Sequence, residues 1–308
     1  MLRREFLGAV ASASLNWAQG PRRPNILFVI ADDLNTDLGC YGHALVQSPH
    51  IDSLARRGVR FERAYAQYPV CNPSRSSFLS GRYPETTGVL DNRANPRANL
   101  KGAVFLPEYL RSQGYFTASI GKIYHDGMQG PNDWDVLLDP RPSSEIGRTG
   151  EGRNLTDGKF PFFEVRAAEG GDDDHADGLI AKEAVRLLEE KRDKPWFLAV
   201  GFRKPHDPYI APKKYFEAYP LSKIPSPKAR RTMAMTSRPP RIPARGTRLM
   251  SRVFGSSARL TRLASVIRTR NWARCLPPSL VRPTRPTRSS FSLAITDFIR
   301  ANIIGSTR

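Results

Sequence analysis

Apolar runs of strand length alternate with stretches of helical periodicity between residues 24 and about 220. The clearest run, residues 25–30 (Asn-Ile-Leu-Phe-Val-Ile), lacks polar alternation, which is typical of a strand buried on both faces. Further strands are predicted at 59–66, 115–120 and 196–201, and helices at 49–57, 105–113 and 174–192. This order predicts an α/β fold with a largely parallel central sheet and helices on both faces.

Small and polar residues mark the ends of the predicted elements. Ser48 is positioned to cap the helix at 49–57 and Gly58 to end it, while Gly114 follows the helix at 105–113. Residues 126–173 contain clusters of Gly, Pro, Asp and Asn without a clear period. We expect this stretch to be a long surface excursion rather than a domain.

Charge divides the chain into two parts. The formal net charge is +19, but residues 228–308 alone contain 17 arginines, one lysine and one acidic residue, so the preceding part is nearly neutral. The hydrophobic content of 40% suits a globular protein, and the composition indicates neither a fibrous nor a transmembrane one. We therefore predict one folded domain over residues 24–227.

The arginine-rich segment 228–308 allows three interpretations. A disordered basic tail would bind nucleic acid or acidic polysaccharide. A folded domain is disfavoured, because Ser, Thr and Pro fill the spaces between the arginines and Glu, His, Gln and Tyr are absent. We favour an aberrant segment, translated out of frame after a frameshift near residues 221–230. A genuine basic tail mixes lysine with arginine, whereas arginine with Pro, Ser and Thr suggests a GC-rich gene read in the wrong frame.

The N-terminus has the order of an export signal. Arg3 and Arg4 precede a short apolar stretch of small residues that ends before Gln19. The arginine pair resembles the twin-arginine type, and the apolar run is too short to span a bilayer. We expect residues 1–20 to be a signal peptide and the protein to be periplasmic or extracellular. Only three cysteines occur, so no disulfide framework is indicated.

The most specific chemical motif is Cys-Asn-Pro-Ser-Arg at 71–75, followed by Ser-Gly-Arg at 80–82. It resembles the sulfatase signature C-x-P-S-R with its downstream Gly-Arg. Elements at 31–33 (Ala-Asp-Asp), 39–42, 49–55 and 61–66 occur in the order of the iduronate-2-sulfatase-like branch. The resemblance covers roughly residues 24–220. It implies an alkaline-phosphatase-like fold, of which 24–227 is a partial N-terminal catalytic domain.

The sulfatase resemblance assigns the nucleophile to Cys71. In that family the cysteine is oxidised to formylglycine (3-oxoalanine), whose hydrate attacks sulfur with one hydroxyl and expels sulfate through the other; a thiolate adduct would have no such exit. Pro73 and Ser74 indicate a helix start, which would place residue 71 at the positive end of the helix dipole. Arg75, one turn on, would brace the hydrate and the metal ligands.

Asp32 and Asp33 follow the first predicted strand, at the edge where open α/β sheets bind ligands. Most Asp-Asp pairs after a strand only cap a turn. With Cys71 downstream, however, they resemble the first two calcium ligands of the family, and oxygen ligands suit Ca²⁺. The resemblance therefore implies a Ca²⁺ site formed by Asp32, Asp33 and the oxidised Cys71.

Two further segments supply candidate catalytic residues. Gly-Lys-Ile-Tyr-His at 121–125 resembles the family's G-K-x-x-H element, in which Lys122 would neutralise a sulfate oxygen and His125 would hydrogen-bond the hydrate. Lys-Pro-His-Asp-Pro at 204–208 resembles a second element, in which His206 would bind or protonate the leaving oxygen. His50 and Asp135 are interpreted as structural residues.

The match to the family breaks beyond residue 228. Sulfatases need a further Asp followed by Asn or His, and another lysine, whereas the only acidic residue there is Asp297. The metal site is therefore expected to be incomplete, and the chain to be truncated or frameshifted, with weak or absent activity and poor folding because the sheet would lack its later strands.

Three functions follow from these observations. The leading one is a Ca²⁺-dependent sulfuric ester hydrolase acting on a sulfated sugar or polysaccharide. The alternatives are a phosphonate or phosphodiester hydrolase of the same superfamily and a catalytically inactive, basic polyanion-binding fragment. The leading function implies a formylglycine-generating enzyme as a maturation partner, no specific nucleic acid and no transmembrane segment.

Overall fold

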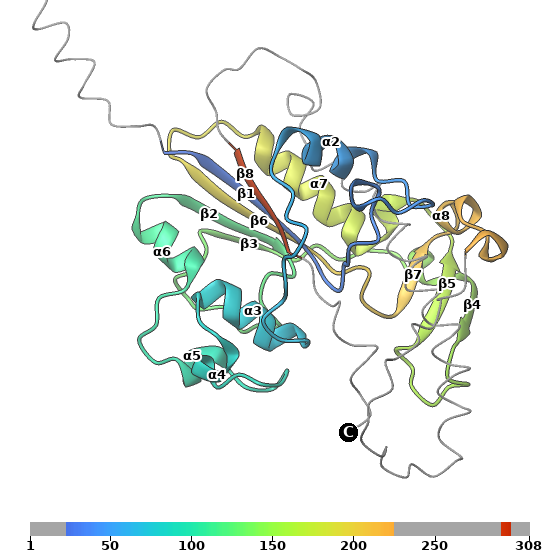
Figure 1. The fold of residues 1–308 in the computed structure, drawn as a ribbon, viewed down its shortest axis with the longest axis horizontal. Helices are drawn as coiled ribbons and strands as arrows, with labels where there is room; N and C mark the ends of the chain where they lie inside the picture. Colours follow the sequence, from blue (N-terminus) through green and yellow to red (C-terminus); the bar gives the residue numbers. More distant parts are fainter. Residues whose placement is uncertain (1–22, 225–290, 297–308) are drawn as a thin grey trace, which may run out of the picture.

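The computed structural model describes residues 23–224 and 291–296 (Figure 1). Parallel strands form a five-stranded central sheet in the order β3-β2-β6-β1-β8. Their bounds are β1 Asn25–Ala31, β2 Phe116–Gly121, β3 Val136–Leu138, β6 Trp196–Phe202 and β8 Phe291–Thr296. The predicted strands at 25–30, 115–120 and 196–201 are confirmed as β1, β2 and β6, and all three meet at the centre of the sheet.

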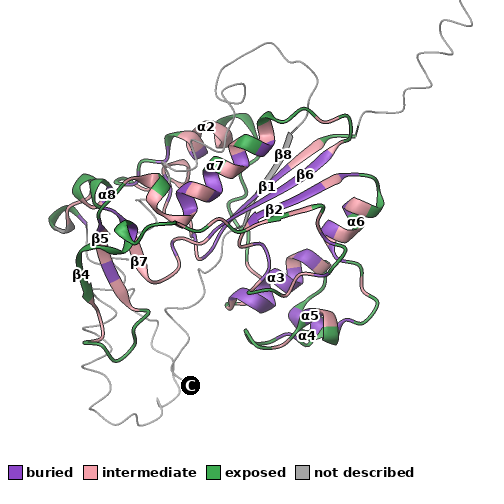
Figure 2. Cartoon of the chain, turned by 180° about the vertical axis from the view of Figure 1, so that it is seen from behind, coloured by how far each residue is buried: buried purple, intermediate pink, exposed green. Residues whose placement is uncertain are grey.

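Each face of the sheet carries its own apolar core, as the alternation of side chains along a strand requires. One core joins β1, β2 and β6 to α2 (Pro49–Arg57) and α7 (Ala176–Glu189), with Ile51 and Ile180 buried in it. The other joins β1 and β6 to α3 (Cys71–Ser80) and α6 (Leu106–Ser112) through Leu79 and Leu110. Figure 2 shows buried positions along both faces. The predicted α/β fold with helices on both faces is confirmed.

The segment 126–173, expected to be a long surface excursion rather than a domain, contains three strands that its lack of a clear period did not predict. Val136–Leu138 (β3) joins the central sheet, and β4 (Gly150–Asn154) pairs with β5 (Glu164–Ala168) in a second sheet. β5 also pairs with β7 (Tyr209–Pro212), which follows the main domain's β6. The alternation of apolar and polar residues could not predict β4, because its sequence, Gly-Glu-Gly-Arg-Asn, contains no large apolar residue.

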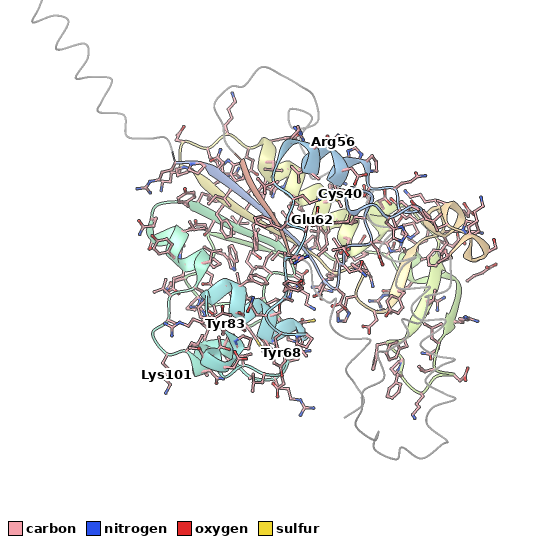
Figure 3. The ribbon with its side chains drawn as sticks, in the orientation of Figure 1. Cys40, Arg56, Glu62, Tyr68, Tyr83 and Lys101 are labelled. Carbon is pink, nitrogen blue, oxygen red and sulfur yellow. The ribbon has the colours of Figure 1, made fainter. Side chains whose placement is uncertain are left out.

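The strand predicted at 59–66 is also wrong. This segment has a turn at 62–63 and otherwise no regular structure, and Val59 and Phe61 are 82% and 69% exposed. In Figure 3, Glu62 and Tyr68 mark the connection as it runs from α2 toward α3. Its alternating apolar and charged residues resemble a strand, but no other strand of the described residues pairs with it.

The shorter elements connect the main ones. They are α4 (Pro84–Thr87), α5 (Pro96–Asn99), α8 (Lys213–Ala218), and the 3-10 helices η1 (Gly39–Tyr41), η2 (Ile146–Arg148), η3 (Asp172–Asp174) and η4 (Leu221–Lys223). The predicted helices 49–57, 105–113 and 174–192 correspond to α2, α6 and α7. Ser48 holds the cap position of α2, but its hydroxyl bonds to Asp52 instead of capping the backbone.

Several predictions concern residues outside the described ranges. The export signal at 1–20 and most of the arginine-rich segment 228–308, Asp297 included, are among them. Within that segment, β8 pairs with β1 along the central sheet, with Phe291 opposite Asn25 and Thr296 opposite Ile30. Across the described residues, no helix has both the length and the apolarity to cross a membrane.

Candidate active site

The predicted site residues converge at the carboxyl edge of the central sheet. The backbone N–H of Asp32, just after β1, donates to Phe202 O at 3.1 Å, and that of Lys122, just after β2, donates to Gly201 O at 2.8 Å. The ends of β1 and β2 are therefore both attached to the end of β6, which lies between them. This edge is where open α/β sheets form ligand sites.

Two glycines permit this close approach. A Cβ on Gly201 would lie 1.9 Å from Lys122 O, and a Cβ on Gly121 would lie 2.3 Å from Gly201 O. Gly121 also has φ of +76°, a left-handed conformation that side chains disfavour. Both positions need glycine because the strand ends pack backbone against backbone.

Cys71 occupies the first turn of a buried helix. The helix α3 begins at Cys71 after the extended residue Val70, and nearly all of its first turns are buried. Asn72 fixes this end: its amide donates to Asp91 O at 2.9 Å and Ala94 O at 2.8 Å, and its backbone N–H donates to Asn92 Oδ1 at 3.0 Å. The predicted helix start is confirmed, and residue 71 lies at the end of the helix that favours anions.

Arg75 and Lys122 both bind the buried carboxylate of Asp32. Arg75 Nη2 donates to Asp32 Oδ1 at 2.9 Å, and Lys122 Nζ donates to Oδ2 at 2.6 Å. Arg75 Nη1 also donates to the carbonyls of Lys122 and Ile123, at 2.7 and 2.8 Å. Burial alone would raise the pKa of Asp32, but the two cations outweigh it and hold that pKa well below its ordinary value.

Asp33 has a different environment from its neighbour. Its backbone φ is +66°, and its Oδ1 is buried without a hydrogen-bond partner. Burial, followed by repulsion from Asp32, raises the pKa of Asp33 to about 6. An orphaned carboxylate oxygen beside a second carboxylate is the environment that a bound cation relieves.

His206 meets Cys71 and Asp32 across the site. The potential ligand atoms of these residues all lie within 4.8 Å of one another, whereas Asp33 falls outside that group. Burial would lower the pKa of His206, but hydrogen bonds with Asp207 and Cys71 outweigh it and raise that pKa to about 11. The imidazole is therefore a cation, suited to donate a proton or to bind an anion.

Asp207 is a site residue that the sequence reasoning missed. Nδ1 of the His206 ring donates to Asp207 O at 2.8 Å and lies 2.9 Å from Asp207 Oδ1. This contact fixes the ring, as a carboxylate next to a catalytic imidazole commonly does. The signal was present in the motif at 204–208, where Asp follows His directly.

His125 lies at the margin of the same site. Its Nε2 is 3.7 Å from Asp126 Oδ2, and its Nδ1 is buried without a partner among the described residues. Burial, and next the charge of Lys122, lower the pKa of His125. The lowered pKa favours the neutral form of the His125 imidazole.

The two residues interpreted as structural have no place in this cluster. Asp135 accepts from Arg111 Nε at 2.8 Å and from the Thr117 backbone N–H at 2.9 Å, which ties β2 to α6. His50 lies in the first turn of α2, half-buried.

The donor set fits part of a calcium site. Asp32 and Asp33 supply carboxylate oxygens, and the unpartnered Oδ1 of Asp33 is available. Ca²⁺ takes about six to eight oxygen ligands, so these residues fill only some positions. A thiol is a poor ligand for this hard ion. Residue 71 would therefore join the site only after its sulfur is replaced by oxygen.

Comparisons with known proteins match this chain to sulfatases. The family model described as Sulfatase matches residues 24–269. Iduronate 2-sulfatase of Mus musculus is 39% identical over 233 residues, covering 71% of this chain. The solved structure of BT4656 in complex with its substrate, D-glucosamine-2-N,6-O-disulfate, is 27% identical with a TM-score of 0.50, covering 67% of this chain.

The similarity in fold extends further than the similarity in sequence. Phosphonate monoester hydrolase of Agrobacterium radiobacter superposes with a TM-score of 0.59 over 82% of this chain at 20% identity. The chain spans 42% of the mouse enzyme's length, 58% of the phosphonate hydrolase and 40% of BT4656.

Proposed function

The chain belongs to the sulfatase family, and on that premise we propose that it hydrolyses sulfate esters carried by a sugar or polysaccharide. The observation that carries the proposal is the position of Cys71: a buried residue at the N-terminus of a helix, within 4.8 Å of an anionic Asp32 and a cationic His206 at their ligand atoms. A nucleophile, a proton donor and the positive end of a helix dipole would therefore all act on a sulfate group bound at Cys71.

We propose that Cys71 acts after oxidation to formylglycine by a formylglycine-generating enzyme. The aldehyde hydrate supplies one hydroxyl to attack sulfur and a second to release sulfate. Arg75 holds Asp32 and the Lys122–Ile123 backbone in place around this residue. Its role is to position the ligands, because its donors are already committed to these partners.

Lys122 neutralises negative charge on the substrate, and the two histidines donate a proton and accept a hydrogen bond. Lys122 carries a positive charge next to Asp32, where it neutralises a sulfate oxygen. His206, with its raised pKa, donates a proton to the leaving oxygen. His125, with its lowered pKa, is neutral and accepts a hydrogen bond from a hydroxyl of the hydrate.

Calcium would be held by Asp32, Asp33 and the oxidised residue 71. When bound, the ion withdraws charge from the sulfate oxygens and compensates the repulsion between the two carboxylates. The proposal agrees with the orphaned Oδ1 of Asp33.

Sulfated carbohydrate is the proposed substrate class, since BT4656 binds a glucosamine disulfate and the mouse relative is named for iduronate 2-sulfate. We further propose export through the signal at residues 1–20, which places the protein where polysaccharides occur.

The test is turnover after maturation. The full chain is co-expressed with a formylglycine-generating enzyme, and mass spectrometry of the peptide containing Cys71 reports exchange of the thiol for a carbonyl oxygen. The matured chain is then assayed with an aryl sulfate and with an aryl phosphodiester or phosphonate, in the presence of Ca²⁺. Faster sulfate turnover, lost in Cys71→Ala, is the expected result. Preference for the phosphorus substrates would assign the chain to phosphonate or phosphodiester chemistry.

The polyanion-binding alternative has its own test. If the chain were only a basic binding fragment, deletion of residues 228–308 would abolish heparin and DNA affinity. Unchanged affinity after the deletion would exclude it.

A further inference from the structure

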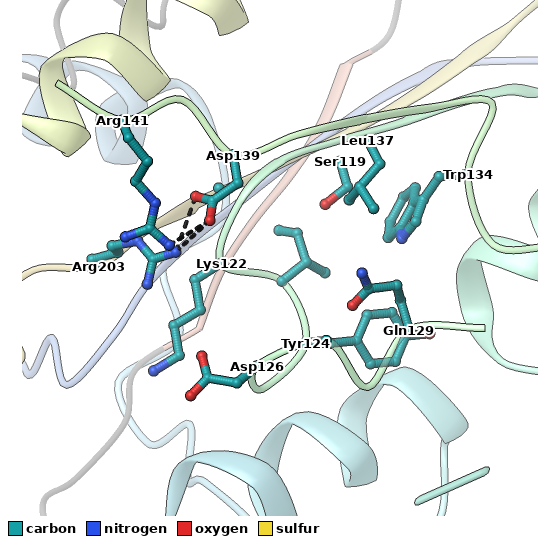
Figure 4. A pocket seen from close by; sticks show the side chains of 13 residues that line it. Ser119, Lys122, Tyr124, Asp126, Gln129, Trp134, Leu137, Asp139, Arg141 and Arg203 are labelled. Atoms are coloured by element: carbon teal, nitrogen blue, oxygen red, sulfur yellow. Dashed lines mark hydrogen bonds and ion pairs between the residues drawn. The ribbon is translucent and has the colours of Figure 1, made fainter. Parts of the chain in front are cut away.

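A cavity of about 330 Å³ opens beside the candidate active site (Figure 4). Its wall includes Lys122, the side chain that pairs with Asp32, together with Arg203, which follows the end of β6 directly. The site and the cavity therefore share one wall and one edge of the sheet. This volume is at the lower end of the range for small-molecule sites, which suits a single sugar unit.

One end of the cavity carries an excess of positive charge. Arg203 Nη2 donates to both oxygens of Asp139, at 3.0 and 2.8 Å, and Arg141 Nη2 donates to Asp139 Oδ2 at 2.6 Å. Figure 4 shows dashed lines that join the Asp139 carboxylate to the neighbouring guanidiniums. At this end of the cavity one anion, Asp139, stands against two cations; the other charged residues in the wall are Lys122, which is paired with Asp32, and Asp126.

Two buried donors in the cavity wall lack partners. Arg203 Nε and Trp134 Nε1 are buried and make no hydrogen bond within the described residues. Both side chains are held in place: the Arg203 backbone N–H donates to Asp177 Oδ1 at 2.9 Å, and the Trp134 ring stacks on Phe197 with centroids 5.8 Å apart. A buried donor without a partner costs about 1–3 kcal/mol, which an acceptor on a bound ligand would recover.

We propose that this cavity is a second anion subsite that binds a carboxylate or a second sulfate on the sugar whose sulfate ester lies at Cys71. Arg203 and Arg141 bind the anionic group, and Trp134 Nε1 donates to a hydroxyl of the same ring. The inference rests on the proposed function, because it takes the substrate to be a sulfated sugar. It adds a preference for sugars with two negative charges over sugars with one.

The test compares ligands that differ by one charge. Isothermal titration calorimetry on the full chain, expressed without the maturation enzyme so that no turnover occurs, uses two pairs of probes. The first is a methyl uronide sulfate and its carboxylate methyl ester; the second is glucosamine 2-N,6-O-disulfate and N-acetylglucosamine 6-sulfate. We expect the doubly charged member of a pair to bind roughly tenfold tighter, the gain of one charge-assisted hydrogen-bonded contact.

The outcomes separate this inference from the proposed function. A preference in the first pair assigns the subsite to a carboxylate, and a preference in the second assigns it to a sulfate. Equal affinities within both pairs would overturn the subsite and leave the sulfated-sugar function standing. Failure of all four probes to bind would contradict the proposed function, and the subsite with it.

Variants locate the preference in the cavity. Arg141→Gln removes a guanidinium whose side chain is 60% exposed, so folding is preserved, and Arg203→Gln removes its 25% exposed neighbour. Each should reduce the preference to near unity, while Arg148→Gln, 78% exposed and outside the cavity, should keep it. Retention of the full preference in Arg141→Gln would refute the subsite even if Arg203→Gln did not fold.

Discussion

Arg75 and Asp32 form an ion pair 2.9 Å long in which both side chains are almost completely buried, at 4% and 3% exposure. Removing a charge pair from water is costly, and the pair persists because Asp32 also binds Lys122 while Arg75 binds two backbone carbonyls. The pair joins α3, which carries Cys71, to the ends of β1 and β2. The ion pair thus fixes the position of Cys71 relative to the carboxyl edge of the sheet.

Arg75→Ala should therefore destabilise the chain by about 3–5 kcal/mol, because it leaves the Asp32 charge buried with one cation fewer. Urea unfolding followed by tryptophan fluorescence measures the change in the free energy of unfolding. The matched control is Arg148→Ala, whose side chain is 78% exposed and which should change stability by less than about 0.5 kcal/mol. A loss below about 1 kcal/mol for Arg75→Ala would contradict a buried and compensated pair.

His175 predicts a pH dependence that is independent of the active site. Burial lowers its pKa from the ordinary value of 6.5, although Asp174 and Asp172 act in the opposite direction and Lys204 reinforces the effect of burial. The unfolded state thus binds a proton more readily than the folded state. The stability contributed by the neutral ring is complete above pH 6.5 and is lost as the pH falls through the lowered folded value.

Replacing His175 by Gln removes this proton site. Thermal unfolding of both proteins between pH 8 and about pH 5 should show a steeper acidic loss for the wild type. The measurement at pH 8, where the ring is neutral, serves as the reference for packing changes made by the substitution. Parallel curves over the whole range would show that His175 is protonated as easily in the folded chain as in the unfolded one.

The three middle strands of the central sheet were predictable from local pattern, whereas β3, β8 and the second sheet were not. β1 and β6 are continuous apolar runs because helices cover both faces, so their burial is visible in the sequence. The segment 59–66 has apolar and charged residues in the same order as a strand but finds no partner, and β4 has a partner without any apolar residue. Pairing is a tertiary property, which a local period does not report.

The candidate site likewise contains residues that the sequence predicted and contacts that only the fold shows. Cys71, Lys122 and His206 were identified because each stands in a short motif, and the structure brings them to one sheet edge. The contact between Asp139 and Arg203 joins residues 64 positions apart, and no motif contains both. The cavity that both residues line depends on where β3 and β6 end, so it could not be predicted without the fold.

The composition of residues 228–308 predicts a specific feature of the gene. Arginine outnumbers lysine there by 17 to one, while residues before 228 contain both. We expect the DNA past codon 220 to contain, in another frame, a continuation that encodes Asp followed by Asn or His and a further lysine. Resequencing the gene from its source checks this. A verified, uninterrupted frame would show that the arginine-rich segment is genuine.

The ionised form of Asp33 is expected to destabilise the chain without calcium and to stabilise it when calcium is bound. With no cation, burial and the Asp32 charge disfavour its ionised form and raise its pKa to about 6, so the carboxylate destabilises the chain at neutral pH. Asp33→Asn should therefore stabilise the chain in EDTA. Added Ca²⁺ should stabilise the wild type, by about 2.7 kcal/mol at roughly 100 times its Kd, and should have little effect on the variant.

Differential scanning fluorimetry in EDTA and in a CaCl₂ series measures both effects without any assay of activity. Asp193→Asn, an exposed acidic residue before β6, is the matched control and should respond to Ca²⁺ as the wild type does. Mg²⁺ should stabilise less, because it demands a tighter octahedral set of ligands than two adjacent carboxylates offer. Equal responses of Asp33→Asn and wild type to Ca²⁺ would mean that the orphaned oxygen of Asp33 does not face the ion, and that the first ligands of the site must be sought elsewhere.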